Sequence, residues 1–327
     1  MGLHLVTGGA GFIGSHIVRA LLEDGHRVRV LDDLSGGSRT NLQGLEVDDL
    51  GSGAAVELLV GDVADPAACT AATQGVEAVF HEAAEVSVPA SFEDPDRHFQ
   101  VNVMGTVRLL EAARLAGARK FVFAASSAAY GDGPESPKHE ELPTRPLSPY
   151  AIAKKAGEDL LAVWGEQYGL QTTALRYFNV FGPRQSDSSP YSGVIAIFAR
   201  RLLTGDPITI HGDGEQTRDF VFVEDVARAN VAALTTASSS GRVFNVGTGH
   251  AVSLNRLHAV LRDLAGGGAD PTHGPARVGD VRHSLADVSR AHQELGWSPR
   301  VTLEEGLAQT LAWYRQRLAA DAGVAAD

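Results

Sequence analysis

The chain has 327 residues, 44% hydrophobic and 21% charged, which is ordinary for a soluble globular protein. Its formal net charge of −12 repels a phosphate backbone, so we expect no nucleic-acid partner. A single cysteine, Cys69, excludes an intramolecular disulfide framework and a multi-cysteine metal site. The chain opens without the pattern of a secretion signal, and no apolar run reaches the roughly 18 residues of a membrane span. We therefore expect a cytoplasmic protein without a membrane partner.

Strand-like and helix-like segments alternate over the first half of the chain. The expected strands are residues 3–7, 27–31, 56–60, 78–81, 120–124 and 172–176, and the helix-like stretches include 12–24, 99–116 and 149–168. This alternation predicts an α/β fold, a doubly wound parallel sheet of the Rossmann type with helices on both faces.

The second half is less regular. A Gly/Asp turn at 211–214 precedes strand-like segments at 218–223 and 242–246, and helix-like segments follow at 254–264, 289–295 and 303–318. We expect residues 1–177 to form the nucleotide-binding domain and residues 178–327 a smaller α/β lobe at the carboxyl edge of the sheet, where such sheets bind ligands. Part of 218–249 is expected to pack back on the first domain.

A glycine-rich turn joins the first expected strand to the first expected helix. Gly8, Gly11 and Gly14 let the turn close, let the backbone approach a pyrophosphate and let the helix pack on the strand. The helix start then offers free N–H groups to the phosphates. Asp32, at the end of the second strand, would bind the adenosine ribose hydroxyls and repel a 2′-phosphate. The combination predicts NAD rather than NADP; the alternative is a tight turn without a ligand.

A Tyr-x-x-x-Lys pattern at Tyr150 and Lys154 lies where a helix is expected to begin. Ser148 suits the N-cap and Pro149 the first helical position. The spacing puts both side chains on one helix face, where an ammonium would favour the phenolate form of the tyrosine. Ser126, after the fifth strand, could hold the substrate oxygen whose proton Tyr150 removes. Alone, the same pattern is typical of a solvated helix face.

These pieces resemble the extended short-chain dehydrogenase/reductase family, and within it the NAD-dependent nucleotide-sugar epimerases. The resemblance keeps the family's motif order over nearly the whole chain. Within the family, the chain looks most similar to UDP-N-acetylglucosamine/UDP-glucose 4-epimerases. Its motifs are residues 7–16, 61–63, 81–84, 102–106, 126–131, 150–154, 176–179, 218–220 and 245–247, with substrate-lobe segments at 176–185, 191–195 and 279–284.

The resemblance implies a mechanism. A bound NAD takes a hydride from sugar C4 while Tyr150 takes the hydroxyl proton, Lys154 binds the nicotinamide ribose, and Ser126 binds the reacting oxygen. The 4-keto sugar then turns over and receives the hydride on its other face. The cofactor residues that it implies are Gly8, Gly11, Phe12, Ile13, Asp32, Asp33, Leu34, Ser35, Gly37, Asp62, Val63, Ala83, Ala84, Asn102, Tyr150, Lys154 and Tyr177.

The resemblance also implies a set of substrate-binding residues. Arg218 and Arg277 suit a diphosphate, since arginine binds phosphate through two hydrogen bonds. Each also has a structural alternative: a surface ion pair for the arginines, a capping residue for Asn179, a turn residue for Asp280. The expected set is Ser87, Ser126, Ser127, Asn179, Gln185, Gly193, Val194, Thr209, His211, Arg218, Arg277, Asp280 and Ser284.

Departures from the family pattern narrow the chemistry. Ala128 stands where 4,6-dehydratases and UDP-glucuronate decarboxylases carry a glutamate, so elimination and decarboxylation lack their acid/base. Glu82 and Glu85 are acidic where many galactose-type epimerases have apolar or basic residues. The run from His81 to Glu85 fails the His-Glu-x-x-His zinc pattern, and we expect no metal.

Two expected helices spread apolar residues over more than one face. They carry Val101, Val103, Met104, Val107, Leu110 and Leu115, and Ile152, Ala156, Leu160, Leu161 and Trp164. The family pairs these helices across a two-fold axis, which implies a homodimer; the alternative is burial within one subunit.

For the activity, the alternatives to a UDP-hexose 4-epimerase are an epimerase of a UDP-uronic acid or another nucleotide sugar, a 4-keto-sugar reductase, and a catalytically silent NAD-binding sensor.

Overall fold

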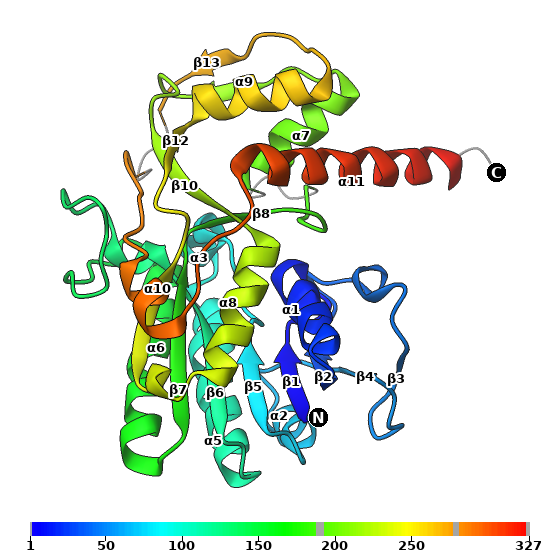
Figure 1. Cartoon of the computed structure of the whole chain (residues 1–327), viewed down its shortest axis with the longest axis vertical. Helices are drawn as coiled ribbons and strands as arrows, with labels where there is room; N and C mark the ends of the chain where they lie inside the picture. The colour runs from blue at the N-terminus through cyan, green and yellow to red at the C-terminus, as the bar shows by residue number, and fades with distance from the viewer. Residues whose placement is uncertain (1, 188–192, 277–280, 325–327) are drawn as a thin grey trace.

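The computed structural model describes residues 2–187, 193–276 and 281–324, which form a sheet lobe and a smaller second lobe (Figure 1). The sheet lobe is built on an eight-stranded sheet, and the eight strands pair in parallel. Its strand order is β11 (Arg242–Val246), β7 (Gln171–Tyr177), β6 (Lys120–Ser126), β5 (Ala78–His81), β1 (Leu3–Thr7), β2 (Arg27–Asp32), β4 (Val56–Val60) and β3 (Val47–Asp49). The predicted doubly wound α/β fold is confirmed.

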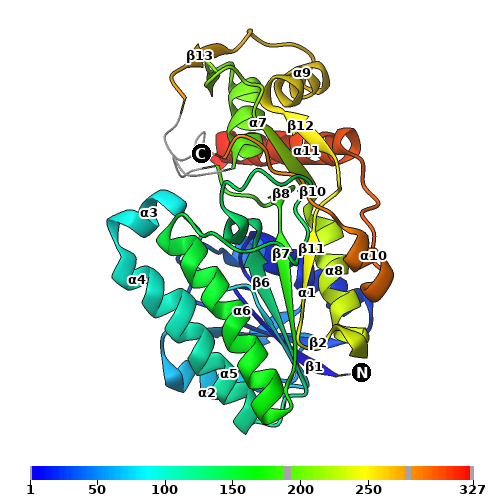
Figure 2. The ribbon, with the colours of Figure 1, turned by 90° about the vertical axis from the view of Figure 1, so that its left-hand side faces the viewer.

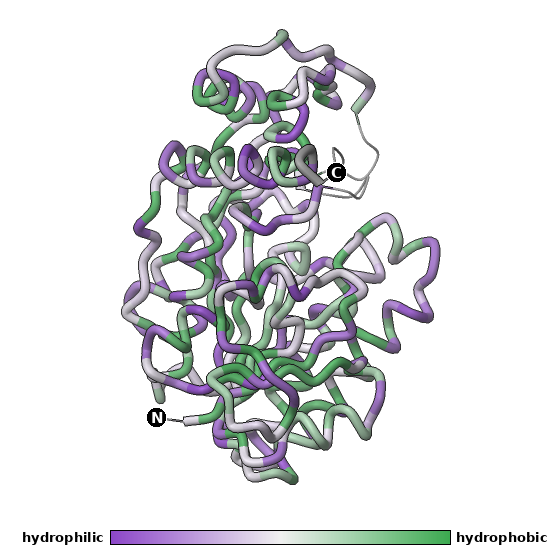
Figure 3. Tube along the Cα trace, turned by 90° about the vertical axis from the view of Figure 1, so that its right-hand side faces the viewer, coloured by the Kyte–Doolittle hydropathy of each residue, from purple (hydrophilic) through white to green (hydrophobic). Residues whose placement is uncertain are grey.

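Helices cover both faces of this sheet (Figure 2). On one face, apolar side chains of α2 (Pro66–Thr73), α5 (Thr106–Leu115) and α6 (Pro149–Tyr168) pack on the strands. On the other face pack α1 (Phe12–Glu23), α8 (Val223–Thr235) and α10 (Ser289–Leu295). In Figure 3 the hydrophobic stretches of the trace gather in the strands between these layers. This two-sided burial explains why the strands read as continuous apolar runs.

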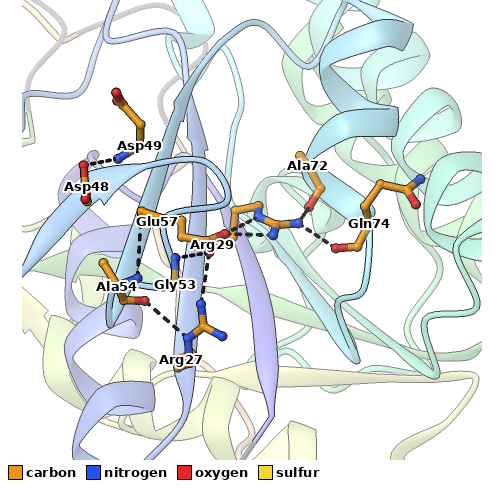
Figure 4. Close-up of polar contacts among 10 residues, drawn as sticks. Arg27, Arg29, Asp48, Asp49, Gly53, Ala54, Glu57, Ala72 and Gln74 are labelled. Carbon is orange, nitrogen blue, oxygen red and sulfur yellow. Dashed lines mark hydrogen bonds and ion pairs between the residues drawn. The ribbon is translucent and has the colours of Figure 1, made fainter.

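A buried ion cluster ties β2 to β4 and α2 (Figure 4). The Arg29 guanidinium donates to the Glu57 carboxylate at 2.8 and 3.0 Å and to the carbonyl oxygens of Ala72 and Gln74 at 3.1 and 2.7 Å. Arg27 donates to the second Glu57 oxygen at 3.0 Å. The Glu57 carboxylate is paired with both arginines, and the Arg29 donors have acceptors. The cluster can therefore be buried between β2, β4 and α2 without leaving an isolated charge. We assign it a structural role.

The second lobe is built on its own apolar core. Phenylalanines of β8 (Asn179–Phe181) and β10 (Thr217–Phe222) pack against α7 (Val194–Thr204), α9 (Leu254–Ala265) and α11 (Leu303–Val324). β12 (Ala251–Ser253) completes a three-stranded sheet, and β9 (Thr209–His211) pairs with β13 (Thr272–Gly274). From β10 the chain continues into α8, which packs on the eight-stranded sheet, and then into β11, the edge strand of that sheet.

Sequence patterns missed several elements. The single helix expected over 99–116 is α4 (Pro95–Phe99), a π-helical turn at Gln100–Gly105, and α5. The sequence analysis also left out α8 and α3 (Val88–Glu93), as well as the short helices at Arg39–Leu42, Ser127–Tyr130 and Ala237–Ser239. Within the ranges that the structure describes, no helix is both long and apolar enough to cross a bilayer.

Candidate active site

The glycine turn closes against the carboxyl ends of the central strands. The Gly8 N–H donates to the Leu31 carbonyl at 2.8 Å, and Gly8 has a φ of 67° that favours glycine. A Cβ on Gly8 would lie 2.8 Å from the Ala83 nitrogen, and one on Gly14 would lie 2.1 Å from the Gly8 oxygen. The backbone of this turn can pack closely on its neighbours only because these positions carry no side chain. Helix α1 begins directly after the turn, at Phe12 and Ile13.

Asp32 organises the loop that follows β2. Its carboxylate accepts hydrogen bonds from the backbone N–H groups of Ala10 and Leu34, both at 2.9 Å. Burial raises the pKa of Asp32, and these two N–H groups partly offset the rise. A Cβ on Gly37 would lie 2.8 Å from the Asp32 carboxylate, so the loop folds back directly over it. Asp33, Leu34 and Ser35 form the rest of this loop.

Arg97 on α4 gathers three carboxylates that follow separate strands. Its guanidinium lies 3.0 Å from Asp62, 3.5 Å from Glu85 and 3.9 Å from Asp33. Asn102 fixes the same loop, since its amide accepts from the Glu85 N–H at 2.8 Å and donates to the Glu85 carbonyl at 2.9 Å. Arg97 was not predicted as a site residue, because nothing local in the sequence marks a residue that bridges three strand ends.

Ser126, Tyr150 and Lys154 meet at the carboxyl edge of the sheet. Ser148 caps α6 by accepting from the Ala151 N–H at 3.1 Å, and Pro149 takes the first position, as predicted. Tyr150 thus lies in the first turn of α6. The Ser126 hydroxyl hydrogen-bonds the Tyr150 side chain, which lowers the pKa of that tyrosine against the larger rise caused by burial.

The Lys154 ammonium contacts the backbone of β6. Its Nζ donates to the Ala124 carbonyl at 2.8 Å and lies 6.0 Å from the Tyr150 ring centroid. Burial lowers the pKa of Lys154 to about 8 and raises the pKa of Tyr150. Helical spacing sets the face of α6 that carries both side chains but not the direction in which the lysine side chain turns, and the effect of Lys154 on the pKa of Tyr150 stays a prediction.

Glu82 adds a charge to this group. Its carboxylate accepts from the Tyr177 hydroxyl at 2.8 Å, and Asn230 on α8 donates to that hydroxyl at 2.8 Å. Burial raises the pKa of Glu82, whereas the Tyr177 hydrogen bond and the charge of Lys154 lower it. Asn230 escaped the sequence analysis because α8 itself was not predicted.

Beneath the site, His81 links β1 and α5. Its ring nitrogens lie 2.8 Å from the Thr7 hydroxyl and 3.0 Å from the Thr106 hydroxyl. Burial lowers the pKa of His81 to about 3, so the ring is neutral near neutral pH. The Thr7 hydroxyl accepts from the Ala83 N–H at 3.2 Å, and Ala84 follows in the same loop. Val63 lies in the apolar core beside them.

The expected substrate residues of the second lobe cluster around β9, β10 and the segment that precedes α10. Arg218 donates to the carbonyls of Thr217 and Arg282 at 2.8 and 3.5 Å, and the Ser284 N–H donates to the Thr217 carbonyl at 3.1 Å. His211 donates to the Pro275 carbonyl at 3.2 Å, and Thr209 lies on the same strand. Ser284 does not cap α10, which begins at Ser289 after Val288.

The other expected substrate residues that the structure describes lie on separate elements. Asn179 is exposed at the start of β8, while Gly193 and Val194 begin α7. A Cβ on Gly193 would lie 2.8 Å from the Gln185 amide nitrogen, which donates to the Val180 carbonyl at 3.2 Å. Ser127 opens the turn after Ser126. Arg277 and Asp280 lie outside the described residues.

Ser87 has a structural role in the described fold. Its hydroxyl accepts from the Ala90 N–H at 3.1 Å and caps α3. In the described parts of the chain, no group of three or more His, Cys, Asp and Glu side chains could hold a metal ion.

Comparison with known proteins assigns this arrangement to a family. Residues 4–247 match the NAD dependent epimerase/dehydratase family. The chain belongs to this family.

Relatives in this epimerase/dehydratase family match the chain end to end. A UDP-glucose 4-epimerase from Mycolicibacterium smegmatis is 44% identical over 96% of this chain and 98% of its own length. A UDP-N-acetylglucosamine 4-epimerase from Methanobrevibacter ruminantium, solved with UDP-N-acetylmuramic acid, is 38% identical with a TM-score of 0.90 over 97% of this chain and 99% of that one. A Thermus thermophilus UDP-glucose 4-epimerase solved with NAD is 40% identical with a TM-score of 0.85, over 96% and 99%.

NAD is the cofactor of this epimerase/dehydratase-family chain, as predicted. The residues present fit it: the glycine turn forms a cradle that a Cβ at Gly8 or Gly37 would fill, and a carboxylate stands at the end of β2. A carboxylate there accepts from ribose hydroxyls and repels a 2′-phosphate.

Proposed function

We propose that the chain is a UDP-sugar 4-epimerase that interconverts UDP-glucose with UDP-galactose and UDP-N-acetylglucosamine with UDP-N-acetylgalactosamine. The observation that carries the proposal is the meeting of Ser126, Tyr150 and Lys154 beside the glycine turn. The similarity over nearly the whole chain to a UDP-glucose 4-epimerase and a UDP-N-acetylglucosamine 4-epimerase supports UDP-sugars as the class of substrate. The family resemblance implies that the residue at position 284 lies beside the sugar C2 substituent, and the small side chain of Ser284 supports the breadth because it would leave room there for an acetamido group.

Each catalytic side chain has a defined task. Tyr150 takes the proton of the sugar hydroxyl and gives it back, and Ser126 donates a hydrogen bond to the same oxygen. Lys154 is assigned to the cofactor ribose, which its ammonium would orient by a hydrogen bond. When bound, NAD supplies a reversible hydride acceptor for the sugar carbon.

The remaining expected residues divide between cofactor and substrate. We assign NAD binding to residues 1–177 together with α8 and β11, and UDP-sugar binding to the rest of the second lobe. On the cofactor side these are Gly8, Gly11, Phe12, Ile13, Asp32, Asp33, Leu34, Ser35, Gly37, Asp62, Val63, Ala83, Ala84, Asn102 and Tyr177. On the substrate side, Arg218 and Arg277 are assigned to the diphosphate.

The test is turnover by the purified protein without added cofactor. Proton NMR of UDP-glucose and UDP-N-acetylglucosamine, each incubated separately, should show the 4-epimer of each. Turnover that requires added NAD(P)H would identify a reductase, and turnover of UDP-glucuronic acid alone would identify a uronic acid epimerase. Denaturation should release NAD, and release of NADP would contradict the role of Asp32.

Replacement of the proposed base separates chemistry from binding. Tyr150→Phe removes the phenol hydroxyl and leaves the ring, so UDP binding measured by calorimetry should persist while kcat falls at least a hundredfold. Near-normal kcat in this variant would show that another group is the base.

We further propose a homodimer formed by α5, α6 and the π-helical turn. Several residues of the apolar set are buried in this chain's own core, including Val101, Leu110 and Leu161. Others of the set are solvent-exposed, namely Met104, Leu115 and Ile152, and so is Val163, which the set did not include. Sedimentation should give the mass of a dimer, and Ile152→Glu should shift it to the monomer; a wild-type monomer would contradict the proposal.

A further inference from the structure

Glu82 is held in place from three directions at the carboxyl end of β5. Its Oε1 accepts from the Tyr177 hydroxyl of β7 at 2.8 Å. That hydroxyl in turn accepts from the Asn230 amide of α8 at 2.8 Å, and Asn230 also donates to the Val226 carbonyl at 3.0 Å. Such a chain of hydrogen bonds leaves the carboxylate little freedom to turn away from its neighbours.

Glu82 lies beside the Lys154 ammonium. It follows His81, the strand partner of Phe123 on β6, and Lys154 donates to the carbonyl of the next β6 residue, Ala124, at 2.8 Å. The charge of Glu82 therefore acts on the titrating groups of α6. Burial lowers the pKa of Lys154 and Glu82 raises it, because a carboxylate favours the ammonium. Burial raises the pKa of Tyr150 and Glu82 raises it further, because two neighbouring anions repel each other. When it is ionised, the carboxylate therefore favours the charged form of Lys154 and the neutral form of Tyr150.

The other titratable groups facing Glu82 stay uncharged near neutral pH. From β5, His81 is neutral, since burial lowers its pKa to about 3. From β7, burial raises the pKa of Tyr177 well above its usual value. In the described part of the site, the groups beside Glu82 whose charge it can influence are thus Lys154 and Tyr150.

We propose that Glu82 is a positioning residue for the reaction, the counter-charge of Lys154 that sets the pH range in which Tyr150 works as a base. The inference rests on the proposed function, because it takes Tyr150 as the group that accepts the sugar proton. It goes beyond that function by assigning a role to Glu82, which is neither the proposed base nor one of the proposed cofactor-binding residues.

Glu82→Gln tests the charge and keeps the contact, since an amide oxygen still accepts from Tyr177. Removing the negative charge should lower the pKa of both Lys154 and Tyr150, so the whole profile of kcat/KM against pH should move by about one pH unit toward acid. Glu82→Asp keeps the charge but shortens the reach to Tyr177. Its profile should stay at the wild-type position even where kcat falls, and a profile like that of Glu82→Gln would overturn the proposal.

Glu77→Gln is the matched control. Glu77 immediately precedes β5 as Glu82 immediately follows it, and it pairs with Arg119 on the opposite, exposed edge of the sheet at 2.6 Å. The variant loses the same unit of charge far from α6, so its profile should match the wild type. An equal acid shift in both variants would overturn the proposal, because net charge alone would then explain it.

A second readout needs no turnover. The phenolate absorbance of the wild type and of Glu82→Gln is measured against pH with NAD bound. The Tyr150 signal is obtained by subtracting the absorbance of the same protein that also carries Tyr150→Phe. In Glu82→Gln the Tyr150 midpoint should fall by about one pH unit; an unchanged midpoint overturns the inference. If UDP-sugars are not converted by any variant, the proposed function fails, while this titration still decides the effect of Glu82 on Tyr150.

Discussion

Arg176 of β7 and Glu158 of α6 form a buried ion pair with two parallel hydrogen bonds, each 2.7 Å long. Both side chains are almost fully buried, and the guanidinium also lies 4.6 Å from the Tyr130 ring centroid. Glu158 is one helical turn beyond Lys154. The pair therefore fixes the helix that carries the proposed base to the strand beside it.

Breaking this pair should destabilise the protein and slow its chemistry. Glu158→Ala leaves the guanidinium buried without its partner, which typically costs about 3–5 kcal/mol. Urea unfolding should show this loss, and kcat should fall because α6 is no longer held. Lys155→Ala breaks an exposed pair with Asp159 on the same helix and should leave the urea midpoint unchanged. Equal effects of the two variants would contradict a special role for the buried pair.

Gly14→Ala should prevent NAD binding. The new methyl group would lie 2.1 Å from the Gly8 oxygen, and this backbone atom cannot move without opening the turn. We expect at least a tenfold loss of bound NAD, measured after denaturation. Gly25→Ala, just beyond the other end of α1, meets open space at a φ of 79°. It should reduce stability by about 1 kcal/mol and keep NAD. Retention of NAD by Gly14→Ala would show that the turn has another purpose.

Ser284→Tyr should narrow the range of sugars. A phenol ring would fill the space that we assign to the acetamido group, and overpacking of this kind costs about 1–3 kcal/mol. Conversion of UDP-N-acetylglucosamine should drop at least tenfold while conversion of UDP-glucose persists. Ser284→Ala serves as the control, and it should convert both sugars. An equal loss of both activities in the tyrosine variant would mean that Ser284 only supports the fold.

Stability should fall on mild acidification. Burial lowers the pKa of His4 to about 4 and the pKa values of His16 and His81 to about 3, whereas in the unfolded chain each titrates near 6.5. The unfolded state therefore binds more protons below pH ~6.5, and the stability present above this pH is lost as the pH falls. Each histidine contributes at most about 1.4 kcal/mol per pH unit.

Urea midpoints between pH 7 and pH 5 measure this effect. His16→Gln can still donate to the Pro183 carbonyl, which His16 contacts at 3.1 Å, but it cannot take up a proton. The variant should lose less stability on acidification than the wild type. An identical pH dependence would assign the acid sensitivity to other groups.

The sequence predicted the parts of the site that depend on neighbouring residues. Ser148 and Pro149 start α6 as their types favour, and Gly8 adopts the positive φ of a tight turn. The position of Asp32 at the end of β2 also follows from strand periodicity. These features are local, so residue type and spacing were enough to find them.

The parts that the sequence did not predict depend on long-range packing. Asn230 reaches Tyr177 only because α8 returns to the sheet lobe. Arg97 meets three carboxylates only because β2, β4 and β5 end at the same edge of the sheet. The contact of Lys154 with the Ala124 carbonyl of β6 likewise depends on how α6 packs against the sheet.

The return of the chain to the sheet lobe has a consequence for dissecting the molecule. After β7 the chain enters the second lobe, returns through α8 and β11, leaves again for α9, and returns once more at α10 before α11. A fragment ending at residue 177 would leave β7 as an unpaired sheet edge and expose the apolar face of α1. We therefore expect the two lobes to melt in a single transition, and neither half to fold when it is expressed alone.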